Sequence, residues 1–408
     1  MSNSEKALQM HEQWNGKLET TAKAHVNSRE DLTIAYTPGV AEPCKVIAKD
    51  PEAAYKYTIK SNTVAVVSDG SAVLGLGNIG ALAAMPVMEG KAVLFKEFGG
   101  VNAVPICLDT QDTEEIIRTV VNIAPAFGGI NLEDISAPRC FEIETRLKEL
   151  LDIPVFHDDQ HGTAIACLAA VIGALRFVKK DMKTAKFVVN GCGAAGSAIG
   201  RLLISMGAEN VTMVDRFGAL YEGIDANLDR IQSYLATVTN KEHKKGTLAD
   251  IAKGADVLIG VSAPNVFTKE IIASMADKAI VFALANPVPE TSYADAIEAG
   301  AAVAGTGRSD SPNQVNNVTV FPGVFRGAID VRAKAITEEM KVAAVYAISE
   351  LIDEKDLRAD YVVPDAFDPR VAPAVAAAVA RVAMETGIAR IKVDPEEVRA
   401  NTMKRVGR

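Results

Sequence analysis

Cysteine is scarce in this chain and long apolar runs are missing, and each shortage excludes a class of protein. The 408 residues include five cysteines, none of them in a Cys-x-x-Cys spacing. An odd number of scattered thiols predicts neither a zinc site nor a disulfide framework, and it fits the reducing cytoplasm. The apolar stretch 163–175 is too short to span a bilayer, and the polar N-terminus lacks the apolar segment of a signal peptide. We therefore expect a cytoplasmic protein that is neither inserted into a membrane nor exported.

Positive charge is also in deficit, which bears on the partners of the protein. Lysine and arginine number 43 against 52 aspartates and glutamates, so the net charge is -9 at pH 7. This charge argues against nucleic acid or an anionic membrane as a partner. The same field repels an anionic substrate, so a pocket for one needs a metal ion or lysines of its own. The composition, 49% hydrophobic and 23% charged, is ordinary for a globular chain with room for two domains.

One glycine-rich turn carries the strongest signal in the sequence. It follows an apolar run, 186–190, that predicts a buried strand, and it leads into a predicted helix, 194–206. Gly191 permits the tight turn, Gly193 lets the backbone approach a pyrophosphate, and Gly196 lets helix and strand pack closely. A turn kept for packing alone is the alternative. The residues of this turn that we predict to bind a dinucleotide are Gly191, Gly193, Ala194, Ala195 and Gly196.

An acidic residue after the next strand bears on the choice of dinucleotide. The predicted strand 211–215 ends in Asp215, 19 residues after Gly196, where the adenosine ribose hydroxyls would lie. Asp215 therefore favours NAD. Arg216 argues in the other direction, because a guanidinium can bind the 2'-phosphate of NADP.

The order of apolar runs and helical stretches predicts an α/β protein in two parts. An N-terminal α/β domain, 1–160, would hold substrate and metal, and a Rossmann-type doubly wound parallel sheet with C-terminal helices would occupy 161–408. A helix over 163–179, beginning after an acidic doublet, would link the two. The predicted strands are 63–68, 103–108, 129–132, 154–157, 187–190, 211–215, 256–261, 280–286 and 302–305, and the C-terminal helices are 332–352 and 371–385.

A second Gly-x-Gly-x-x-Gly match, at 75–80, is not predicted to bind a nucleotide. The strand before it ends at residue 68, and Pro86 and Gly90 interrupt the stretch that follows before a regular helix is complete. We interpret these residues as a close-packed loop near substrate, with a purely structural loop as the alternative.

Two acidic doublets each follow a short strand-like run. They are Glu133-Asp134 and Asp158-Asp159. Carboxylates at the carboxyl ends of neighbouring parallel strands converge on one crevice, and an all-oxygen site suits Mg2+ or Mn2+. Exposed acidic pairs are common, so solvated loops are the alternative when the doublets are considered alone.

Many ordered motifs give the chain a wider resemblance. Over nearly its whole length it resembles the malic enzymes of the short bacterial type. This resemblance implies metal-dependent oxidative decarboxylation of L-malate to pyruvate and CO2 with reduction of NAD or NADP, in a homodimer. The matching stretches are 35–41, 67–70 with 75–77, 89–91, 132–134, 157–163, the glycine-rich turn, 286–287, 316–317 and 321–323.

The resemblance also implies a role for particular residues. Lys91 and Tyr36 would handle protons, and Asp158 would orient the base. The larger malic enzymes carry a substrate arginine shortly after the first Asp-Gly, but Ser-Ala-Val stands at 71–73 here, so carboxylate recognition must differ. The implied metal ligands are Glu133, Asp134 and Asp159, and the implied substrate amides are Asn286, Asn316 and Asn317, with Asn286 also near the cofactor.

Elementary chemistry agrees with these assignments. A neutral Lys91 would accept the C2 hydroxyl proton as hydride leaves, oxaloacetate would lose CO2, and Tyr36 would supply a proton to C3. A free lysine needs about 4.6 kcal/mol to be neutral at pH 7. His157 and His161 are expected to make local hydrogen bonds. Two other classes compete: a metal-independent amino-acid dehydrogenase and a catalytically silent NAD-binding regulator.

Overall fold

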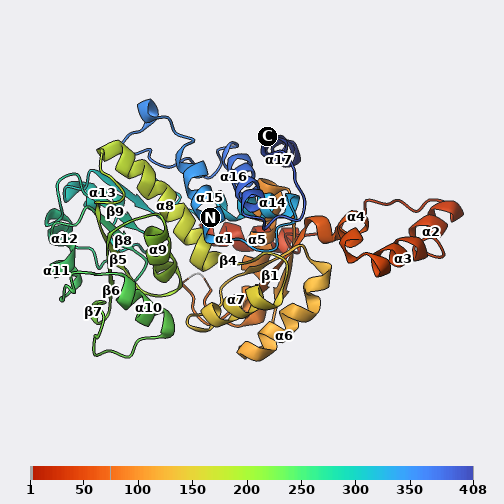
Figure 1. Ribbon diagram of the computed structural model, residues 1–408, viewed down its shortest axis with the longest axis horizontal. Coiled ribbons are helices and arrows are strands. Elements are labelled where there is room, and N and C mark those ends of the chain that lie inside the picture. Colours follow the sequence, from red (N-terminus) through yellow and green to blue (C-terminus); the bar gives the residue numbers. More distant parts are fainter. Residues whose placement is uncertain (1–2, 74, 408) are drawn as a thin grey trace.

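Two sheets of mainly parallel strands form the body of the protein (Figure 1). The computed structural model describes residues 3–73 and 75–407, so Met1 and Ser2 of the N-terminal segment considered above lie outside the described residues. Helices surround both sheets, and the long helix α8 (Asp158–Val178) runs between them. The predicted α/β fold is therefore confirmed.

The first sheet has four parallel strands in the order β2-β1-β3-β4. Side chains of its central strand β1 alternate between two cores. Val64 and Val66 pack in the cluster that contains Phe95, whereas Ala65 and Val67 pack in a second cluster on the opposite face. Burial of both faces is typical of a parallel sheet covered by helices. The strands are β1 (Thr63–Ser68), β2 (Asn102–Cys107), β3 (Gly129–Leu132) and β4 (Val155–His157), and the connecting helices are α5 (Ala81–Gly99), α6 (Thr113–Ile123) and α7 (Arg139–Leu150).

Helix α5 corrects one prediction. It continues through Pro86 and Gly90, so the expectation that these residues interrupt the helix is wrong. Pro86 lies in the second turn of α5, so the helix lacks one backbone hydrogen bond there. The apolar face that includes Met88 and Phe95 is buried without exposed surface. Tertiary packing of this face therefore outweighs the poor helix propensity of the two residues.

The second sheet has six strands in the order β10-β9-β8-β5-β6-β7, and only the short β7 is antiparallel to its neighbour. The chain reverses direction across the sheet at β5, which places the glycine-rich turn at the switch point where doubly wound sheets bind ligands. Its strands are β5 (Lys186–Asn190), β6 (Asn210–Asp215), β7 (Gly218–Ala219), β8 (Val257–Gly260), β9 (Ile280–Ala283) and β10 (Val303–Thr306), and its helices are α9 (Ala194–Ser205), α10 (Arg230–Val238), α11 (Leu248–Ala252), α12 (Lys269–Ala273) and α13 (Tyr293–Glu298).

Helix α8 differs from its prediction in two respects. It begins at Asp158, so both carboxylates of the second doublet lie in its first turn, and the prediction that the helix starts after the doublet is wrong. Negative side chains stabilise a helix N-terminus, which explains the earlier start. The helix is also long and apolar enough to cross a membrane by length and composition, so the apolar stretch was wrongly judged too short. Because 83% of that stretch is buried inside the protein, α8 acts here as a core helix.

The C-terminal helices pack on the first sheet as well as on one another. Phe321 of α14 lies against Phe95 of α5, with ring centroids 4.6 Å apart, and Phe325 lies 5.3 Å from the same ring. The last part of the chain therefore covers the N-terminal sheet. These helices are α14 (Phe321–Asp330), α15 (Glu338–Ser349), α16 (Val371–Glu385) and α17 (Pro395–Val406).

Helices α2 (Arg29–Ala35) and α3 (Ala41–Lys49) form an arm that projects from the body, whereas α1 lies on the body itself (Figure 1). No residue of α2 or α3 is buried. Several apolar side chains of the arm face solvent, among them Ile34, which is 67% exposed. The helices before β1 are α1 (Asn3–Trp14), α2 (Arg29–Ala35), α3 (Ala41–Lys49) and α4 (Ala54–Tyr57), and the short 3-10 helices of the chain are η1 (Pro51–Ala53), η2 (Ile59–Asn62), η3 (Ala124–Ala126), η4 (Asn317–Thr319) and η5 (Glu354–Asp356).

Candidate active site

A cavity of about 1040 Å³ is lined by residues from both sheets. Its wall includes side chains that follow β3, β8, β9 and β10, so carboxyl ends of parallel strands meet around it. This is where the sequence predicted the site. The predicted residues that line the cavity are Lys91, Glu133, Asp159, Ala194, Ala195, Asn286, Asn316 and Asn317.

Three carboxylates gather at one side of the cavity. Glu133, Asp134 and Asp159 each offer an oxygen atom, and these atoms lie within 4.8 Å of one another. The pairing of β3 with β4 brings the first doublet beside the N-terminus of α8. Burial raises the pKa of Glu133 well above its ordinary value; Lys91 opposes this effect, and the neighbouring carboxylates add to it. A compact set of oxygen donors with excess negative charge fits a hard divalent cation such as Mg2+ or Mn2+.

Lys91 lies beside this cluster on the buried face of α5. Its Nζ is 2.5 Å from Oδ2 of Asp158 and 2.9 Å from Oε1 of Glu133. It also lies 4.1 Å above the ring centroid of Phe321. Burial lowers the pKa of Lys91, but the carboxylates of Asp158 and Glu133 outweigh burial and raise it above its ordinary value. The structure therefore holds the ammonium group between two carboxylates.

Asp158 is fully buried behind Lys91, in the first turn of α8. Its Oδ2 also accepts a hydrogen bond of 2.9 Å from the side-chain amide of Asn317. A Cβ atom on Gly162 would lie 1.9 Å from Oδ1 of Asp158. The glycine of the 157–163 motif is therefore required by the position of this carboxylate, and a larger residue would displace it.

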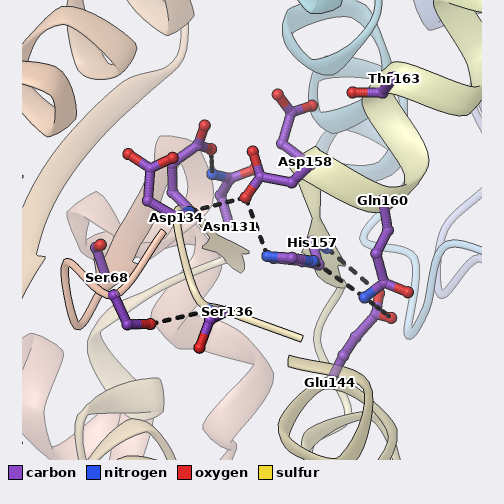
Figure 2. A network of polar contacts seen from close by, with 12 residues as sticks. Ser68, Asn131, Asp134, Ser136, Glu144, His157, Asp158, Gln160 and Thr163 are labelled. Atoms are coloured by element: carbon purple, nitrogen blue, oxygen red, sulfur yellow. Dashed lines mark hydrogen bonds and ion pairs between the residues drawn. The ribbon is translucent and has the colours of Figure 1, made fainter. Parts of the chain in front are cut away.

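The two histidines of the same motif make local hydrogen bonds, as expected. Nδ1 of His157 lies in hydrogen-bond contact with the side-chain nitrogen of Gln160, at 3.0 Å (Figure 2), and its Nε2 lies 3.1 Å from Oδ2 of Asp159 as an ion pair. His161 lies in hydrogen-bond contact with the buried carboxylate of Glu144, at 2.7 Å. Burial lowers the pKa of His161 to about 3, although Glu144 opposes the shift. His161 is thus a neutral structural residue near neutral pH.

The glycine-rich turn has the geometry that the sequence predicted. It joins β5 to α9, and a Cβ atom on Gly196 would lie 1.8 Å from the carbonyl oxygen of Gly191. A Cβ atom on Gly193 would meet no heavy atom within 4 Å, so this position is open toward a ligand. At the end of β6, Asp215 accepts a hydrogen bond of 3.0 Å from the side chain of Gln232. Asp215 therefore lies where an acid of this fold contacts a ribose.

The three predicted amides come from the second half of the chain. Asn286 follows β9, and a Cβ atom on Gly75 would lie 2.9 Å from the backbone oxygen of Asn286. Gly75 therefore packs beside the cavity, but Leu76 is 69% exposed and a Cβ atom on Gly77 or Gly80 would meet no heavy atom within 4 Å, so the interpretation of 75–80 as a close-packed loop is wrong beyond Gly75. Asn316 caps η4 through a hydrogen bond of 3.0 Å to the backbone N–H of Val318. Asn317 links the cavity wall to Asp158, as described above.

Tyr36 lies apart from the other predicted catalytic residues, Lys91 and Asp158. It stands at the end of α2 on the projecting arm, and 68% of its surface is exposed. It does not line the cavity of its own chain as far as the described residues define that cavity. The predicted proton donor and the predicted base are therefore not brought together within one chain.

Ser262 and Lys17 are among the residues of the cavity wall that were not predicted from the sequence. Ser262 follows β8, beside β5, and accepts a hydrogen bond of 2.7 Å from Asn190. The rule that ligands bind at strand ends would have found it. Lys17 also reaches the cavity, where its Nζ donates to the backbone oxygen of Pro86 at 2.6 Å. No motif marks Lys17, because it follows an exposed helix and only the fold brings it to α5.

The fold and the site together define a class: a two-part α/β dinucleotide-binding protein with a buried carboxylate cluster and a lysine in the same cavity. Two family descriptions match this chain. Residues 15–148 match "Malic enzyme, N-terminal domain", and residues 160–384 match "Malic enzyme, NAD binding domain". The chain belongs to the malic enzyme family and is an oxidoreductase.

Similar proteins agree with this assignment over nearly the full length. The bifunctional malic/malolactic enzyme of Bacillus subtilis is 57% identical, with 99% of this chain and 98% of that protein covered. The NAD-dependent malic enzyme of Geobacillus stearothermophilus is 56% identical over 92% of this chain and 78% of the relative. The crystal structure of malic enzyme from Pyrococcus horikoshii has 47% identity and a TM-score of 0.95, with 100% and 96% of the two chains covered.

The comparisons also decide between the classes left open by the sequence. The amino-acid dehydrogenase and the silent regulator are not favoured. Other relatives are named NADP-dependent malic enzymes, so both nicotinamide cofactors occur among proteins similar to this chain.

Proposed function

We propose that this protein catalyses the oxidative decarboxylation of L-malate to pyruvate and CO2, with hydride transfer to a nicotinamide dinucleotide and with a divalent cation at the carboxylate cluster. The observation that carries the proposal is the shared cavity. Lys91, the carboxylates of Glu133 and Asp159, and the helix N-terminus at Ala194 all line it. When bound, the cation would polarise the C2 oxygen of the substrate and stabilise the enolate that remains after CO2 leaves.

Lys91 is the proposed base for the C2 hydroxyl. Its two ion pairs keep it protonated, so it must pass a proton to a neighbour before it can accept one from malate. Asp158 is the nearest acceptor, at 2.5 Å, and burial raises its pKa although Lys91 and Asn317 oppose the shift. A proton shared by this buried pair gives Lys91 the neutral form that the chemistry requires.

Lys17 supplies a cation for the second carboxylate of malate. Its backbone N–H donates to Glu89 at 3.1 Å, which fixes Lys17 at α5, two residues before Lys91 in that helix. The Nζ uses one donor on Pro86 and has two others for a substrate. Burial lowers the pKa of Lys17, and Glu89 opposes this effect. In this proposal Lys17 takes the role that an arginine has in the larger malic enzymes.

NAD is the proposed cofactor and NADP the alternative. Asp215 would accept hydrogen bonds from the ribose hydroxyls and would repel a 2'-phosphate. Its two oxygens are held by Gln232 and by the backbone N–H of Arg216, at 3.0 and 2.7 Å. Steady-state kinetics with both cofactors tests this preference, and a higher kcat/KM with NADP would reverse it.

The active unit is proposed to be a homodimer in which each cavity receives Tyr36 from the other copy. Tyr36 belongs to a motif shared with the family but lies on an exposed arm. Apolar side chains on that arm, including Leu32 at 50% and Ile34 at 67% exposure, offer a surface that a second copy would bury. The exchange would bring the proton donor for C3 to the cavity that contains Lys91.

Mixing two inactive variants tests this exchange. Lys91→Ala and Tyr36→Phe chains are purified separately, mixed in equal amounts and allowed to re-pair. If Tyr36 acts across the dimer, random pairing produces some sites that contain both intact residues. These sites should amount to about a quarter of all sites, so about a quarter of the wild-type activity should return. If both residues act within one chain, mixing restores no activity, and the exchange is wrong.

The central experiment measures NADH or NADPH formed from L-malate with Mn2+ and identifies the carbon product. Pyruvate with stoichiometric CO2 is the expected result. Oxaloacetate as the final product would indicate an ordinary malate dehydrogenase, and turnover that persists in EDTA would remove the metal from the proposal.

A second activity, formation of lactate, is proposed from the relative that is 57% identical and named a bifunctional malic/malolactic enzyme. Pyruvate that stays in the cavity with the reduced dinucleotide would accept the hydride and a proton. Malate would then give lactate and CO2 without net reduction of the cofactor. Lactate formed from malate with catalytic NAD supports this activity, and pyruvate alone contradicts it.

A further inference from the structure

A buried row of polar contacts joins the helix of the dinucleotide turn to one of the proposed metal ligands. Arg201 of α9 donates to the side-chain oxygen of Gln160 at 3.2 Å. The side-chain nitrogen of Gln160 lies 3.0 Å from Nδ1 of His157, and Nε2 of His157 lies 3.1 Å from Oδ2 of Asp159 (Figure 2). His157 and Gln160 have no exposed surface. The row therefore reaches the carboxylate cluster through the protein interior.

The partners of Gln160 fix the direction of each hydrogen bond. A guanidinium only donates, so Arg201 must face the amide oxygen. The amide nitrogen lies 3.3 Å from Oε2 of Glu144, and a carboxylate only accepts. The NH2 group therefore faces Nδ1 of His157, and Nε2 of His157 lies 3.1 Å from Oδ2 of Asp159 as an ion-pair contact. Gln160 thus holds the imidazole ring in the orientation that places it against this carboxylate.

The same oxygen of Asp159 is held from a second direction. The backbone N–H of Asp134 donates to Oδ2 of Asp159 at 2.8 Å. One backbone hydrogen bond and one ion-pair contact on the same oxygen set the orientation of this carboxylate, while the residue itself still lines the cavity. Removing one of them would free the side chain to turn away from Glu133 and Asp134.

We propose that Gln160 is a positioning residue for the cation site, and that Arg201 couples this site to dinucleotide binding through α9. The proposal rests on the function proposed above. A dinucleotide at Ala194 and Ala195 restrains α9 and with it Arg201, whereas a cation restrains Asp159. The dinucleotide and the cation each restrict the motion of side chains in the same row of contacts. Binding of one therefore lowers the conformational entropy cost of binding the other. The coupling is reciprocal by thermodynamic necessity.

The test measures binding without substrate, so that no turnover occurs. Free Mn2+ is followed by electron paramagnetic resonance in the full-length protein, with and without saturating NADH, and NADPH is used in parallel. Wild-type protein is expected to bind Mn2+ about fivefold or more tightly when the dinucleotide is present. The reverse titration, of NADH with and without Mn2+, must give the same factor.

Two variants separate positioning from coupling. Gln160→Glu keeps the shape of the side chain but replaces the donor to His157 with an acceptor, and it is expected to weaken Mn2+ binding by about 10- to 100-fold. Arg201→Met is expected to leave Mn2+ affinity alone nearly unchanged and to reduce the coupling factor to about one. If Gln160→Glu fails to fold, Arg201→Met still tests the row.

Arg176→Met is the matched control. Arg176 also lies on α8 and is partly buried, but it donates to the backbone oxygens of Ser349 and Ile352 at 2.8 and 3.1 Å, away from the cluster. It should change neither affinity nor coupling. Coupling that is absent from the wild type, or that survives in Arg201→Met, would overturn the inference. If the wild-type protein does not oxidise malate in the presence of Mn2+, the proposed function is wrong, whatever the binding measurements show.

Discussion

The two sheet edges that meet at the cavity are built from different groups. The edge after β3 and β4 presents charged side chains, with Glu133, Asp134 and Asp159 close together and Lys91 beside them. The edge after β5 presents backbone groups, because glycine removes the side chains from the turn. On the first edge the proposed function depends on charged side chains. On the second edge it depends on glycines, whose missing side chains leave room for a ligand to approach the backbone. Substitutions on the two edges should therefore fail in different ways.

The largest effect is expected for Glu133→Gln on the charged edge. The variant should lose about a thousandfold in kcat/KM for malate, because one ligand of the cation is removed. Without metal it should be more stable than the wild type at pH 7, since the raised pKa of Glu133 means that its ionised form is unfavourable in the fold. Activity assays with Mn2+ and urea unfolding in EDTA measure the two quantities.

Glu142→Gln is the control for this variant, because Glu142 is exposed on α7 of the same half. The two variants also differ in the response to metal. Saturating Mn2+ should stabilise the wild type and Glu142→Gln by about 2.7 kcal/mol at 100 times the Kd. A Glu133→Gln protein that gains the same stability from Mn2+ would show that the cation binds elsewhere.

Two glycine variants test the backbone edge. Gly196→Ala should lower both stability and dinucleotide affinity, by roughly 1–3 kcal/mol of unfolding free energy, since its Cβ would lie 1.8 Å from the oxygen of Gly191. Gly193→Ala adds the same methyl group where no protein atom lies within 4 Å. It should keep the wild-type melting temperature but bind NADH about tenfold more weakly, a loss of ~1.4 kcal/mol. Full affinity in Gly193→Ala would mean that the pyrophosphate does not approach this turn.

Lys17→Met gives a smaller effect that is specific for substrate. Loss of a charge-assisted hydrogen bond should raise the KM for malate about 10- to 100-fold, with kcat changed much less. Lys17→Arg keeps a cation and should recover most of the affinity. If both variants retain the wild-type KM, another group binds the second carboxylate.

Most of the fold could be predicted from local pattern. The strands 63–68 and 129–132 match their predictions, and the other core strands differ by a few residues at their ends. The errors occurred where tertiary contacts override local preference. Helix α5 continues through Pro86 because its apolar face is buried, and α8 starts at Asp158 because carboxylates suit a helix N-terminus. The exposed helices of the arm carry no periodic apolar signal strong enough to predict them.

The candidate site was predictable where residues follow strands or stand in ordered motifs. Glu133 and Asp159 come together because β3 and β4 are neighbours, which alternation of strands and helices anticipates. Lys17 could not be found in this way, since its position depends on contacts with α5 that no local pattern encodes. The separation of Tyr36 from Lys91 was equally hard to predict, because a motif gives the identity of a residue but not its position in the fold.

The last effect concerns the buried charges behind the charged edge. Burial lowers the pKa of Lys341 to about 8, and Glu338 and Glu144 oppose this shift. Because the folded pKa lies below that of an unfolded lysine, the unfolded chain binds more protons between about pH 8 and 10.5. This group therefore makes the protein more stable as the pH rises through that window, by up to ~1.4 kcal/mol per pH unit, and Lys341→Met should lack the contribution. Urea unfolding of both proteins at pH 7.5 and 9.5 isolates it, since the other lysines and tyrosines are common to both. An equal pH dependence of the unfolding free energy in the two proteins would show that Glu338 and Glu144 fully offset the cost of burying the Lys341 ammonium. The electrostatic difference between the two sheet edges would then be confined to the residues that line the cavity.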